Sequence, residues 1–392
     1  MSRYLESLAP FGMRLGLERI DELCRRLGEP QRGLDAVHVV GTNGKSSTTR
    51  FCAAALAAQG LRVGAYLSPH VLGWHERVQL DGEPVDPEVF ALALGRVEAA
   101  SDGLAEPPTQ FEALTAAAFC VLADAGVEAS VIEAGLGGRH DATRVVAART
   151  VGLTNIGLDH TAVLGETRPE ILAEKLAVLE PGSTLCLGLV DDEIALLAGH
   201  LAGVARALVR RVSRDEADGL PLTVAYQREN AALGLALAET HLLPRPFDRV
   251  GAVAELAGAQ PPGRLEVIAH DPLTVLDGAH NVEGMHALVG ELASLLGESR
   301  PRIAVVALQD DKPIDAMLAA LRPAVDRIIG TESGHLGHAS SLPAARISDL
   351  AFADPVAALA EARRLAGPRG AVVVCGSLYL LARLQTEETR NA

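Results

Sequence analysis

The sequence predicts an α/β protein of two domains, each built on a mostly parallel sheet covered by helices. Short β-rich runs alternate along the chain with longer runs rich in Ala and Leu, a pattern typical of parallel strands joined through helices. The chain of 392 residues is long enough for two domains, and its hydrophobic content of 48% predicts buried cores. The stretch GAQPPGR at 258–264 interrupts the alternation with adjacent prolines, which cannot continue a helix. We therefore expect one domain at 1–262 and a smaller one at 263–392.

The first domain contains short strand-like runs interspersed with longer helix-like runs. Parallel strands need a crossover between them, and a helix is the usual crossover, so this order favours a parallel sheet with helices on its faces. The expected strands include 36–40, 62–67, 129–133, 150–154 and 184–187, and the expected helices include 47–59, 87–100, 111–125, 168–179 and 228–240.

The second domain restarts the same alternation after the linker. Its pattern predicts a smaller, Rossmann-like α/β unit. The expected strands are 273–276, 303–308, 327–330 and 371–375, and the expected helices are 282–296 and 314–321.

The amino-acid composition argues against two classes of binding partner, nucleic acids and membranes. The net charge of −15 argues against a broad surface for nucleic acid or an anionic membrane, and 3% aromatic content disfavours base stacking. No run approaches the roughly 18 apolar residues of a membrane span, and MSRYLESLAP lacks the apolar core of a signal peptide. The five cysteines, at 24, 52, 120, 186 and 375, form no C-x-x-C pair. We expect a cytoplasmic protein that binds neither nucleic acid nor membrane.

The stretch GTNGKSS at 41–47 lies between an expected strand and an expected helix. Backbone N–H groups and a helix N-terminus in this context can hold phosphates, so the stretch predicts a P-loop-type nucleotide site. Lys45 would neutralise phosphate oxygens, and Ser46 or Ser47 would supply a hydroxyl near Mg²⁺. The loop is two residues shorter than the common G-x-x-x-x-G-K-[ST] spacing. An ordinary Gly-Asn turn before a serine-capped helix is the alternative, and the strand-loop-helix context favours the nucleotide site.

Three polar residues follow expected strands in this domain. Glu133 ends one strand, while Ser68 and His160 lie just beyond two others. Ligands of parallel sheets bind at the carboxyl ends of strands, so these side chains predict an Mg²⁺ site beside the nucleotide. Histidine is an unusual ligand for so hard an ion, and Glu133 alone would also fit a solvated acid before a Gly-rich loop.

Lys175 lies on the apolar stripe of the helix expected at 168–179, in register with Ile171 and Leu179. Lysine is rare on a core-facing stripe unless it is paired or functional. The alternative is a lysine whose ammonium group reaches solvent past the edge of the stripe. We favour a functional lysine.

The second domain offers three candidates near its start. Arg264 lies at the linker, where a cation could clamp phosphates, and Asp277 and His280 follow the strand expected at 273–276. A surface ion pair is the alternative for Arg264, and a helix-start residue is the alternative for His280.

A set of motifs occurs in one order between residues 4 and 380: GTNGKSS, LSPH, FEALTAAAF, IEAGLGGRHDAT, IGLDHTAVLG, EKLAVLEPG, QRENAAL, PGRLEV, LDGAHN and CGSLYL. This set closely resembles the folylpolyglutamate synthase/dihydrofolate synthase family of ATP-dependent Mur-type ligases. That family has a short G-T-N-G-K form of the P-loop, which accounts for the two missing residues.

The resemblance implies a bifunctional enzyme that forms an amide through an acyl phosphate. ATP phosphorylates a carboxylate of dihydropteroate or of a folate, and the amine of L-glutamate then displaces phosphate. The implied cofactors are ATP, two Mg²⁺ ions and a monovalent cation, and the implied state is a monomer. A Mur-type ligase for another carboxylate is the alternative, although those enzymes usually carry a UDP-binding domain before the P-loop. A third alternative is a P-loop regulator that uses ATP as a switch. The core-facing Lys175 and the second-domain residues Arg264 and Asp277 argue against it.

The resemblance also implies roles for individual residues. Lys175 matches a lysine that is carbamylated in the family, which turns a cation into an anion able to help hold a second Mg²⁺. Two positions depart from the family pattern: Ser46 replaces a common Gly, and His140 replaces a common Leu. The implied sets are Lys175 and His280 for catalysis; Thr42, Asn43, Gly44, Lys45, Ser46, Ser47, Asn230, Arg264 and Asp277 for ATP; Ser68, Glu133 and His160 for metal; and Ser7, Leu8, Ala9, Pro10, Thr109, Phe111, His140, Asp141 and Ala142 for folate.

Overall fold

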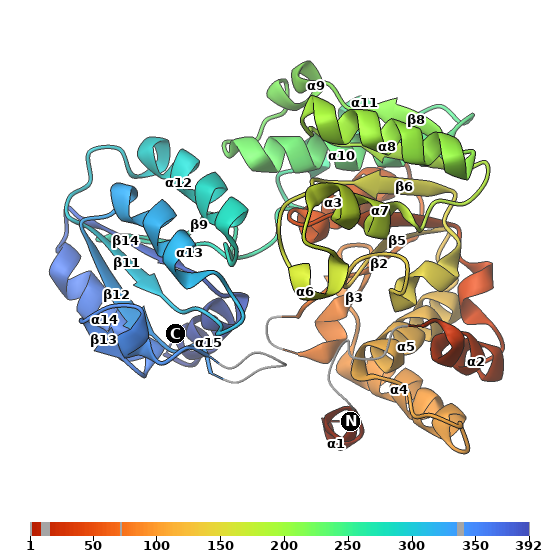
Figure 1. Cartoon of the computed structure of the whole chain (residues 1–392), viewed down its shortest axis with the longest axis horizontal. Coiled ribbons are helices and arrows are strands. Elements are labelled where there is room, and N and C mark those ends of the chain that lie inside the picture. Colours follow the sequence, from red (N-terminus) through yellow and green to blue (C-terminus); the bar gives the residue numbers. More distant parts are fainter. Residues whose placement is uncertain (1, 9–15, 71–72, 335–340, 392) are drawn as a thin grey trace. The chain divides into compact units, whose positions relative to one another are not determined.

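The computed structural model describes residues 2–8, 16–70, 73–334 and 341–391, and it confirms the predicted α/β class (Figure 1). The chain divides into two compact units, Met1–Gln260 and Pro261–Ala392. Each unit contains its own sheet, and in each sheet most neighbouring strands are parallel.

Unit 1 contains an eight-stranded sheet in the order β4-β3-β2-β5-β1-β6-β7-β8. The strands from β2 to β8 in this order pair in parallel, and β3 and β4 add an antiparallel edge. The parallel arrangement brings the carboxyl ends of β1, β5 and β6 to one edge of the sheet. The strands are β1 Ala36–Val40, β2 Val63–Tyr66, β3 Val78–Leu80, β4 Glu83–Pro84, β5 Ala129–Glu133, β6 Thr150–Leu153, β7 Thr184–Leu187 and β8 Leu208–Arg211.

Helices cover both faces of this sheet. Val37 and Val39 of β1 pack with α3 (Lys45–Ala57) and α10 (Ala225–Leu242) in one core. Side chains alternate along a strand, so the other residues of β1 face the opposite side, where α5 (Gln110–Ala125) and α7 (Arg168–Leu176) contribute to two further cores. The remaining α-helices of unit 1 are α1 Ser2–Ser7, α2 Glu18–Arg26, α4 Pro87–Ser101, α6 Thr161–Leu164, α8 Asp192–Ala205, α9 Arg214–Asp218 and α11 Arg249–Glu255.

Unit 2 contains a six-stranded sheet in the order β13-β12-β11-β14-β10-β9, in which only the β9–β10 pair is antiparallel among the described strands. Its strands are β9 Glu266–His270, β10 Leu273–Leu276, β11 Arg302–Val306, β12 Arg327–Thr331, β13 Ala351–Phe352 and β14 Ala371–Cys375. Its helices are α12 Val282–Leu296, α13 Ile314–Leu321, α14 Pro355–Ala366 and α15 Leu378–Asn391.

Some predicted boundaries are wrong by a few residues. The helix expected at 47–59 begins earlier, at Lys45, because Gly44 takes a left-handed conformation and lets the chain enter the helix directly. The helix expected at 168–179 ends at Leu176, shortly before the Glu-Pro-Gly stretch at 180–182. The antiparallel β3–β4 edge, α8, β8 and α14 were not predicted.

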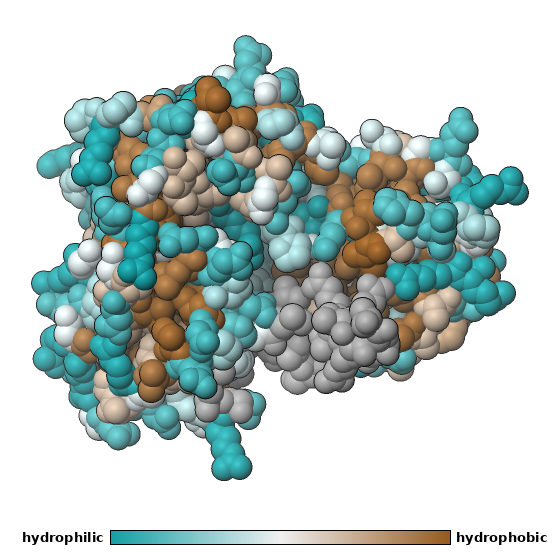
Figure 2. Space-filling view, turned by 180° about the vertical axis from the view of Figure 1, so that it is seen from behind, coloured by the Kyte–Doolittle hydropathy of each residue, from teal (hydrophilic) through white to brown (hydrophobic). Residues whose placement is uncertain are grey.

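Hydrophobic and hydrophilic residues are interspersed on the surface seen in Figure 2. No helix among the described residues is both long enough and apolar enough to span a bilayer.

Candidate active site

The loop between β1 and α3 holds the P-loop residues at the carboxyl edge of the unit 1 sheet. Gly44 has φ +81°, a left-handed conformation that favours glycine, and it directly precedes α3. A Cβ at Gly44 would collide with Oδ1 of Asn230 on α10. The loop therefore needs glycine there both for its backbone angle and for the close approach of α10. The first N–H groups of α3 point out of the helix end, where they can bind an anion.

The end of β6 holds this loop in place. The N–H of Thr42 donates to the carbonyl oxygen of Asn155 at 3.0 Å, and the N–H of Asn43 donates to Oδ1 of Asn155 at 2.9 Å. The hydroxyl of Thr154 donates to the carbonyl oxygen of Asn43 at 2.6 Å, and the N–H of Gly157 donates to the Thr42 hydroxyl at 3.0 Å. Sequence reasoning did not single out Asn155, Thr154 or Gly157. Their position at the end of the strand expected at 150–154, or shortly after it, was the available signal.

Lys45 and Lys175 meet at one backbone oxygen. The Nζ atom of Lys175 donates to the carbonyl oxygen of Gly41 at 2.8 Å, and Nζ of Lys45 lies 3.1 Å from the same oxygen and 3.2 Å from that of Thr42. Lys175 is 4% exposed, on the buried side of α7. Lys175 therefore lies on the core-facing side of its helix, as the sequence predicts.

Burial, reinforced by the positive charge of Lys45, lowers the pKa of Lys175 to about 7, against the opposing effect of Asp141, Asp159 and Glu174. A substantial fraction of Lys175 then carries a neutral amine near pH 7. A neutral amine is a nucleophile, whereas the ammonium form of an ordinary lysine is not.

Glu133 lies at the end of β5 with its carboxylate turned to the P-loop and to the segment after β2. Its side chain is buried, with Oε1 2.9 Å from the hydroxyl of Ser46 and Oε2 accepting the N–H of Ser68 at 3.0 Å. The Ser46 hydroxyl also lies 3.3 Å from the carbonyl oxygen of Ser68. The hydroxyl that reaches Glu133 thus belongs to Ser46, and Ser47 is buried in the first turn of α3.

His160 occupies a different setting from Glu133 and Ser68. It precedes α6 with φ +51°, its side chain is 44% exposed, and its Nε2 lies 3.9 Å from Oδ1 of Asp159. In the described parts of the chain, no three or more His, Cys, Asp or Glu side chains form a group able to hold a metal ion. Glu133 with the oxygens of Ser46 and Ser68 is nevertheless a set of hard oxygen donors of the type that Mg²⁺ prefers.

The loop after β5 is organised by Asp141. Its buried carboxylate accepts the N–H of Leu136 at 2.7 Å through Oδ2, and both the N–H and the hydroxyl of Thr143 through Oδ1, at 3.0 and 2.5 Å. Burial raises the pKa of Asp141, against the lowering effect of these hydrogen bonds. Ala142 is buried beside it, and His140 is exposed.

The other residues in the expected folate set are dispersed. A Cβ at Gly135 would collide with the ring of Phe111, so Phe111 packs directly on the glycine loop. Thr109 caps α5, with its hydroxyl accepting the N–H of Glu112 at 3.2 Å. Ser7 is exposed and Leu8 is buried. Ala9 and Pro10 lie outside the described residues.

Asn230 is held toward the P-loop by a residue that sequence reasoning missed. Its Nδ2 donates to Oε1 of Gln227 at 3.0 Å, which turns Oδ1 of Asn230 to Gly44. Gln227 is fully buried one turn earlier on α10. Its spacing of three residues from Asn230 on a helix was the available signal.

The three candidates of unit 2 cluster at the turns beside the end of β10. The carboxylate of Asp277 accepts the N–H of Leu265 at 3.0 Å and that of Ala279 at 2.8 Å. Nη1 of Arg264 donates to the carbonyl oxygen of Gly263 at 3.0 Å, and Nδ1 of His280 lies 2.9 Å from that of Gly278. Asp277 therefore shapes the turn that carries the other two side chains.

Comparison with known proteins finds relatives along the whole chain. Residues 263–378 match the family model described as Mur ligase, glutamate ligase domain. A dihydrofolate synthase/folylpolyglutamate synthase of Bacillus subtilis is 30% identical over 416 residues, covering 96% of this chain and 95% of that protein. The structure of E. coli FolC in complex with DHPP and ADP aligns with a TM-score of 0.90 at 28% identity, covering 100% of this chain and 97% of that one. A bifunctional folylpolyglutamate synthase/dihydrofolate synthase of Yersinia pestis, complexed with AMPPNP and Mn ion, aligns with a TM-score of 0.87 at 30% identity, covering 99% and 97%.

Some relatives are much longer than this chain. The chain spans about half the length, 51% and 50%, of two curated relatives from Halobacterium salinarum and Haloferax volcanii, each 34% identical over 428 residues. Both carry the name "Probable bifunctional folylpolyglutamate synthase/dihydropteroate synthase".

Proposed function

Because the chain belongs to the folylpolyglutamate synthase/dihydrofolate synthase family, we propose that it is an ATP-dependent ligase that joins L-glutamate to a folate-type carboxylate. The observation that carries this proposal is the meeting of the P-loop, the Lys175 amine and the Glu133 carboxylate at one sheet edge. We propose activity on both dihydropteroate and tetrahydrofolate, as the names of the relatives suggest.

The reaction has two steps, and neither step requires an oxidant or a reductant. A carboxylate oxygen of the substrate attacks the γ-phosphorus of ATP, the bond to the bridging oxygen breaks, and ADP leaves. The neutral amine of glutamate then attacks the acyl carbon, phosphate leaves with the bonding electrons, and the nitrogen releases one proton to solvent and keeps the other as the amide N–H. Such phosphoryl transfer needs positioning and charge neutralisation more than covalent help.

The P-loop supplies both requirements. Backbone N–H groups at the start of α3 would hold the phosphates, with Thr42, Asn43, Gly44, Ser46 and Ser47 forming the cradle. Lys45 would move its ammonium group from the carbonyl oxygens of Gly41 and Thr42 to phosphate oxygens, which carry more negative charge. Asn230 would contact the nucleotide from α10.

We propose that Glu133, Ser46 and Ser68, with His160, hold Mg²⁺ beside the phosphates. The oxygen donors of the first three fit a hard cation, and the relative from Yersinia pestis binds a Mn ion with AMPPNP. Bound there, Mg²⁺ would neutralise charge on the transferring phosphoryl group. A second Mg²⁺ and a monovalent cation belong to the same proposal.

Lys175 would serve as a carbamate. Its neutral amine would attack CO₂, an N–C bond would form, and the nitrogen would release one proton to solvent, so a neutral amine would become an anionic carbamate. The lowered pKa of Lys175 supports this chemistry, because only the neutral amine can react.

The remaining proposals concern further contacts with ATP and the folate, the cellular location and the oligomeric state. In unit 2, Arg264 and Asp277 would contact ATP, and His280 would lie at the phosphates. Ser7 to Pro10, Thr109, Phe111 and 140–142 would serve the folate side. We further propose that the protein is a monomer and that it is cytoplasmic; its five cysteines, all buried and free of disulfides, support the second of these.

One assay tests the proposal: purified full-length protein with ATP, Mg²⁺, L-glutamate and either dihydropteroate or tetrahydrofolate, with products identified by mass. The expected result is ADP release that requires both glutamate and a folate, with one glutamate added per turnover. A Mur-type ligase for another carboxylate is the second candidate, because the matched family model is that of the Mur ligases. ADP release that needs an amino acid but ignores folates would favour it.

A further inference from the structure

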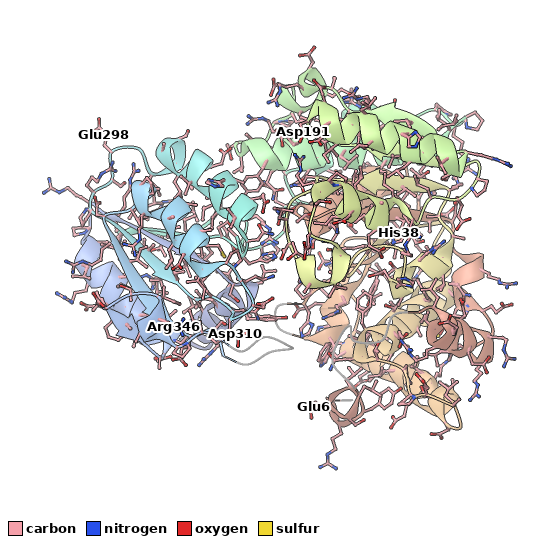
Figure 3. The ribbon with its side chains drawn as sticks, viewed as in Figure 1. Glu6, His38, Asp191, Glu298, Asp310 and Arg346 are labelled. Atoms are coloured by element: carbon pink, nitrogen blue, oxygen red, sulfur yellow. The ribbon has the colours of Figure 1, made fainter. Side chains whose placement is uncertain are left out.

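A buried histidine occupies the middle of the central strand of unit 1. His38, labelled in Figure 3, lies in β1 between Val37 and Val39. Only 1% of its surface is exposed. Its neighbours are the apolar residues expected of a parallel strand buried on both faces. An imidazole in such a place is unfavourable unless it is hydrogen-bonded. His38 therefore calls for a reason beyond filling the core.

The ring of His38 begins a chain of hydrogen bonds. Its Nε2 lies 2.8 Å from the hydroxyl oxygen of Thr143, and that hydroxyl donates its one hydrogen to Oδ1 of Asp141. The Nε2 atom of His38 must then be the donor to Thr143. Burial, helped by the charge of Arg144, lowers the pKa of His38 to about 4, so the ring is neutral near pH 7. The chain of donors runs from His38 through Thr143 to Asp141.

Asp141 connects this chain of hydrogen bonds to the loop at 134–141. Its Oδ2 accepts the N–H of Leu136, which closes the loop on itself. The far side of the loop rests on the end of α7: a Cβ at Gly138 would collide with the carbonyl oxygen of Lys175, and the N–H of Arg139 donates to the carbonyl oxygen of Glu174 at 3.0 Å.

We propose that His38 and Thr143 are positioning residues that act through Asp141 to fix the loop at 134–141 and, through it, Lys175. The consequence for catalysis rests on the proposed function, in which Lys175 takes part. The mechanical part, from His38 to α7, rests on the hydrogen bonds and the close packing alone.

The first test uses Thr143→Val, which keeps the shape of the side chain but removes the hydroxyl. The expected result is a fall in kcat of about 10- to 100-fold, because misplacement by about 1 Å can reduce a rate 100-fold. The KM for ATP should change less than 3-fold or so, since the P-loop is held from β6. Thr143→Ser restores the hydroxyl and should recover most of kcat. Failure of Thr143→Ser to recover activity, or a normal kcat in Thr143→Val, would overturn the proposal.

The chain offers a matched control at the opposite edge of the same sheet. There His241, also 1% exposed, has Nδ1 3.3 Å from the hydroxyl of Thr150, the first residue of β6. Thr150→Val removes a buried hydroxyl from a buried histidine just as Thr143→Val does. It should lower the thermal midpoint and leave kcat unchanged. Equal losses of kcat in the two variants would mean that a general loss of stability, and not positioning, explains the effect.

A second readout does not depend on any activity. Amide hydrogen exchange by mass spectrometry should be at least about 10-fold faster in Thr143→Val for the loop at 134–141 and for α7, and unchanged there in Thr150→Val. Unchanged exchange in Thr143→Val would overturn the relay even if the protein proves to have a different activity. If Thr143→Val does not fold, His38→Leu removes only the first donor, and the same segments should exchange faster by a smaller factor; no change in His38→Leu would equally overturn the relay.

Discussion

The Nζ atoms of Lys45 and Lys175 approach one acceptor, the carbonyl oxygen of Gly41, at 3.1 and 2.8 Å. Burial, together with the nearby positive charge of Lys45, lowers the pKa of Lys175. This arrangement leads to the first prediction.

Replacement of Lys175 by Ala should reduce ligation at least about 1,000-fold, because no amine remains to form a carbamate. Lys175→Arg is the matched variant, since it keeps a cation but cannot be carbamylated; it should be equally inactive. Glutamate-dependent ADP release measures both, and ¹³C-bicarbonate NMR should give a carbamate signal only in the wild type. Activity retained by Lys175→Arg would show that charge alone is needed.

Replacement of Glu133 by Gln should lower kcat about 100-fold or more and raise the Mg²⁺ concentration needed for half-maximal rate. The amide keeps the size of the side chain but removes the charge that a divalent cation needs. Glu128→Gln, where an exposed glutamate accepts the N–H of Arg62 near the opposite end of β5, is the control and should behave like the wild type. An unchanged Mg²⁺ requirement in Glu133→Gln would remove this residue from the metal site.

Substitution of two glycines, one near each end of α3, should distinguish the cost of backbone strain from the cost of a steric collision. Gly44 and Gly60 have nearly equal φ angles, +81° and +80°, but a Cβ at Gly60 meets nothing within 4 Å. Gly60→Ala should reduce the free energy of unfolding by about 1–2 kcal/mol, the usual strain of a left-handed residue. Gly44→Ala should cost more and weaken ADP binding at least about 10-fold, because Asn230 must move. Denaturant titration and calorimetry measure the two effects, and equal behaviour of both variants would contradict the close approach of Asn230.

Buried histidines should make the protein less stable in mild acid. Burial lowers the pKa of His241 to about 4 from 6.5, although Asp35 opposes the shift. Between these pH values the unfolded chain binds a proton that the folded chain does not, so the free energy of unfolding rises with pH and is lost as pH falls from 6.5 to 4. The loss from one such group is on the order of 3 kcal/mol. Urea titrations across this range should show His241→Gln with a slope smaller by about one proton, and an identical slope would contradict the prediction.

The sequence was informative where a single element carries the signal. Lys175 could be recognised because it is a charged residue within an apolar stripe that repeats with the period of an α-helix. Glu133 could be recognised because it is a charged residue at the end of an apolar strand. The unpredicted contacts join elements far apart in the chain. Asn155 holds the P-loop because β6 lies beside β1, and strand order is not encoded in local periodicity. His38 looked like part of an apolar strand, since its partner Thr143 lies about a hundred residues away. Strands as short as β3 and β4 offer too few alternations to be recognised.

The last strand of the unit 1 sheet, β8, has a consequence for behaviour at high concentration. An edge strand presents backbone groups that can pair with another chain, and Leu208 and Val209 at its start are exposed. Its second half is Arg210 and Arg211, with Arg210 held by Glu239 at 2.6 Å. Two copies meeting edge to edge along β8 would have to accommodate these charged side chains, and charged residues on an edge strand oppose the growth of a continuous sheet from one molecule to the next.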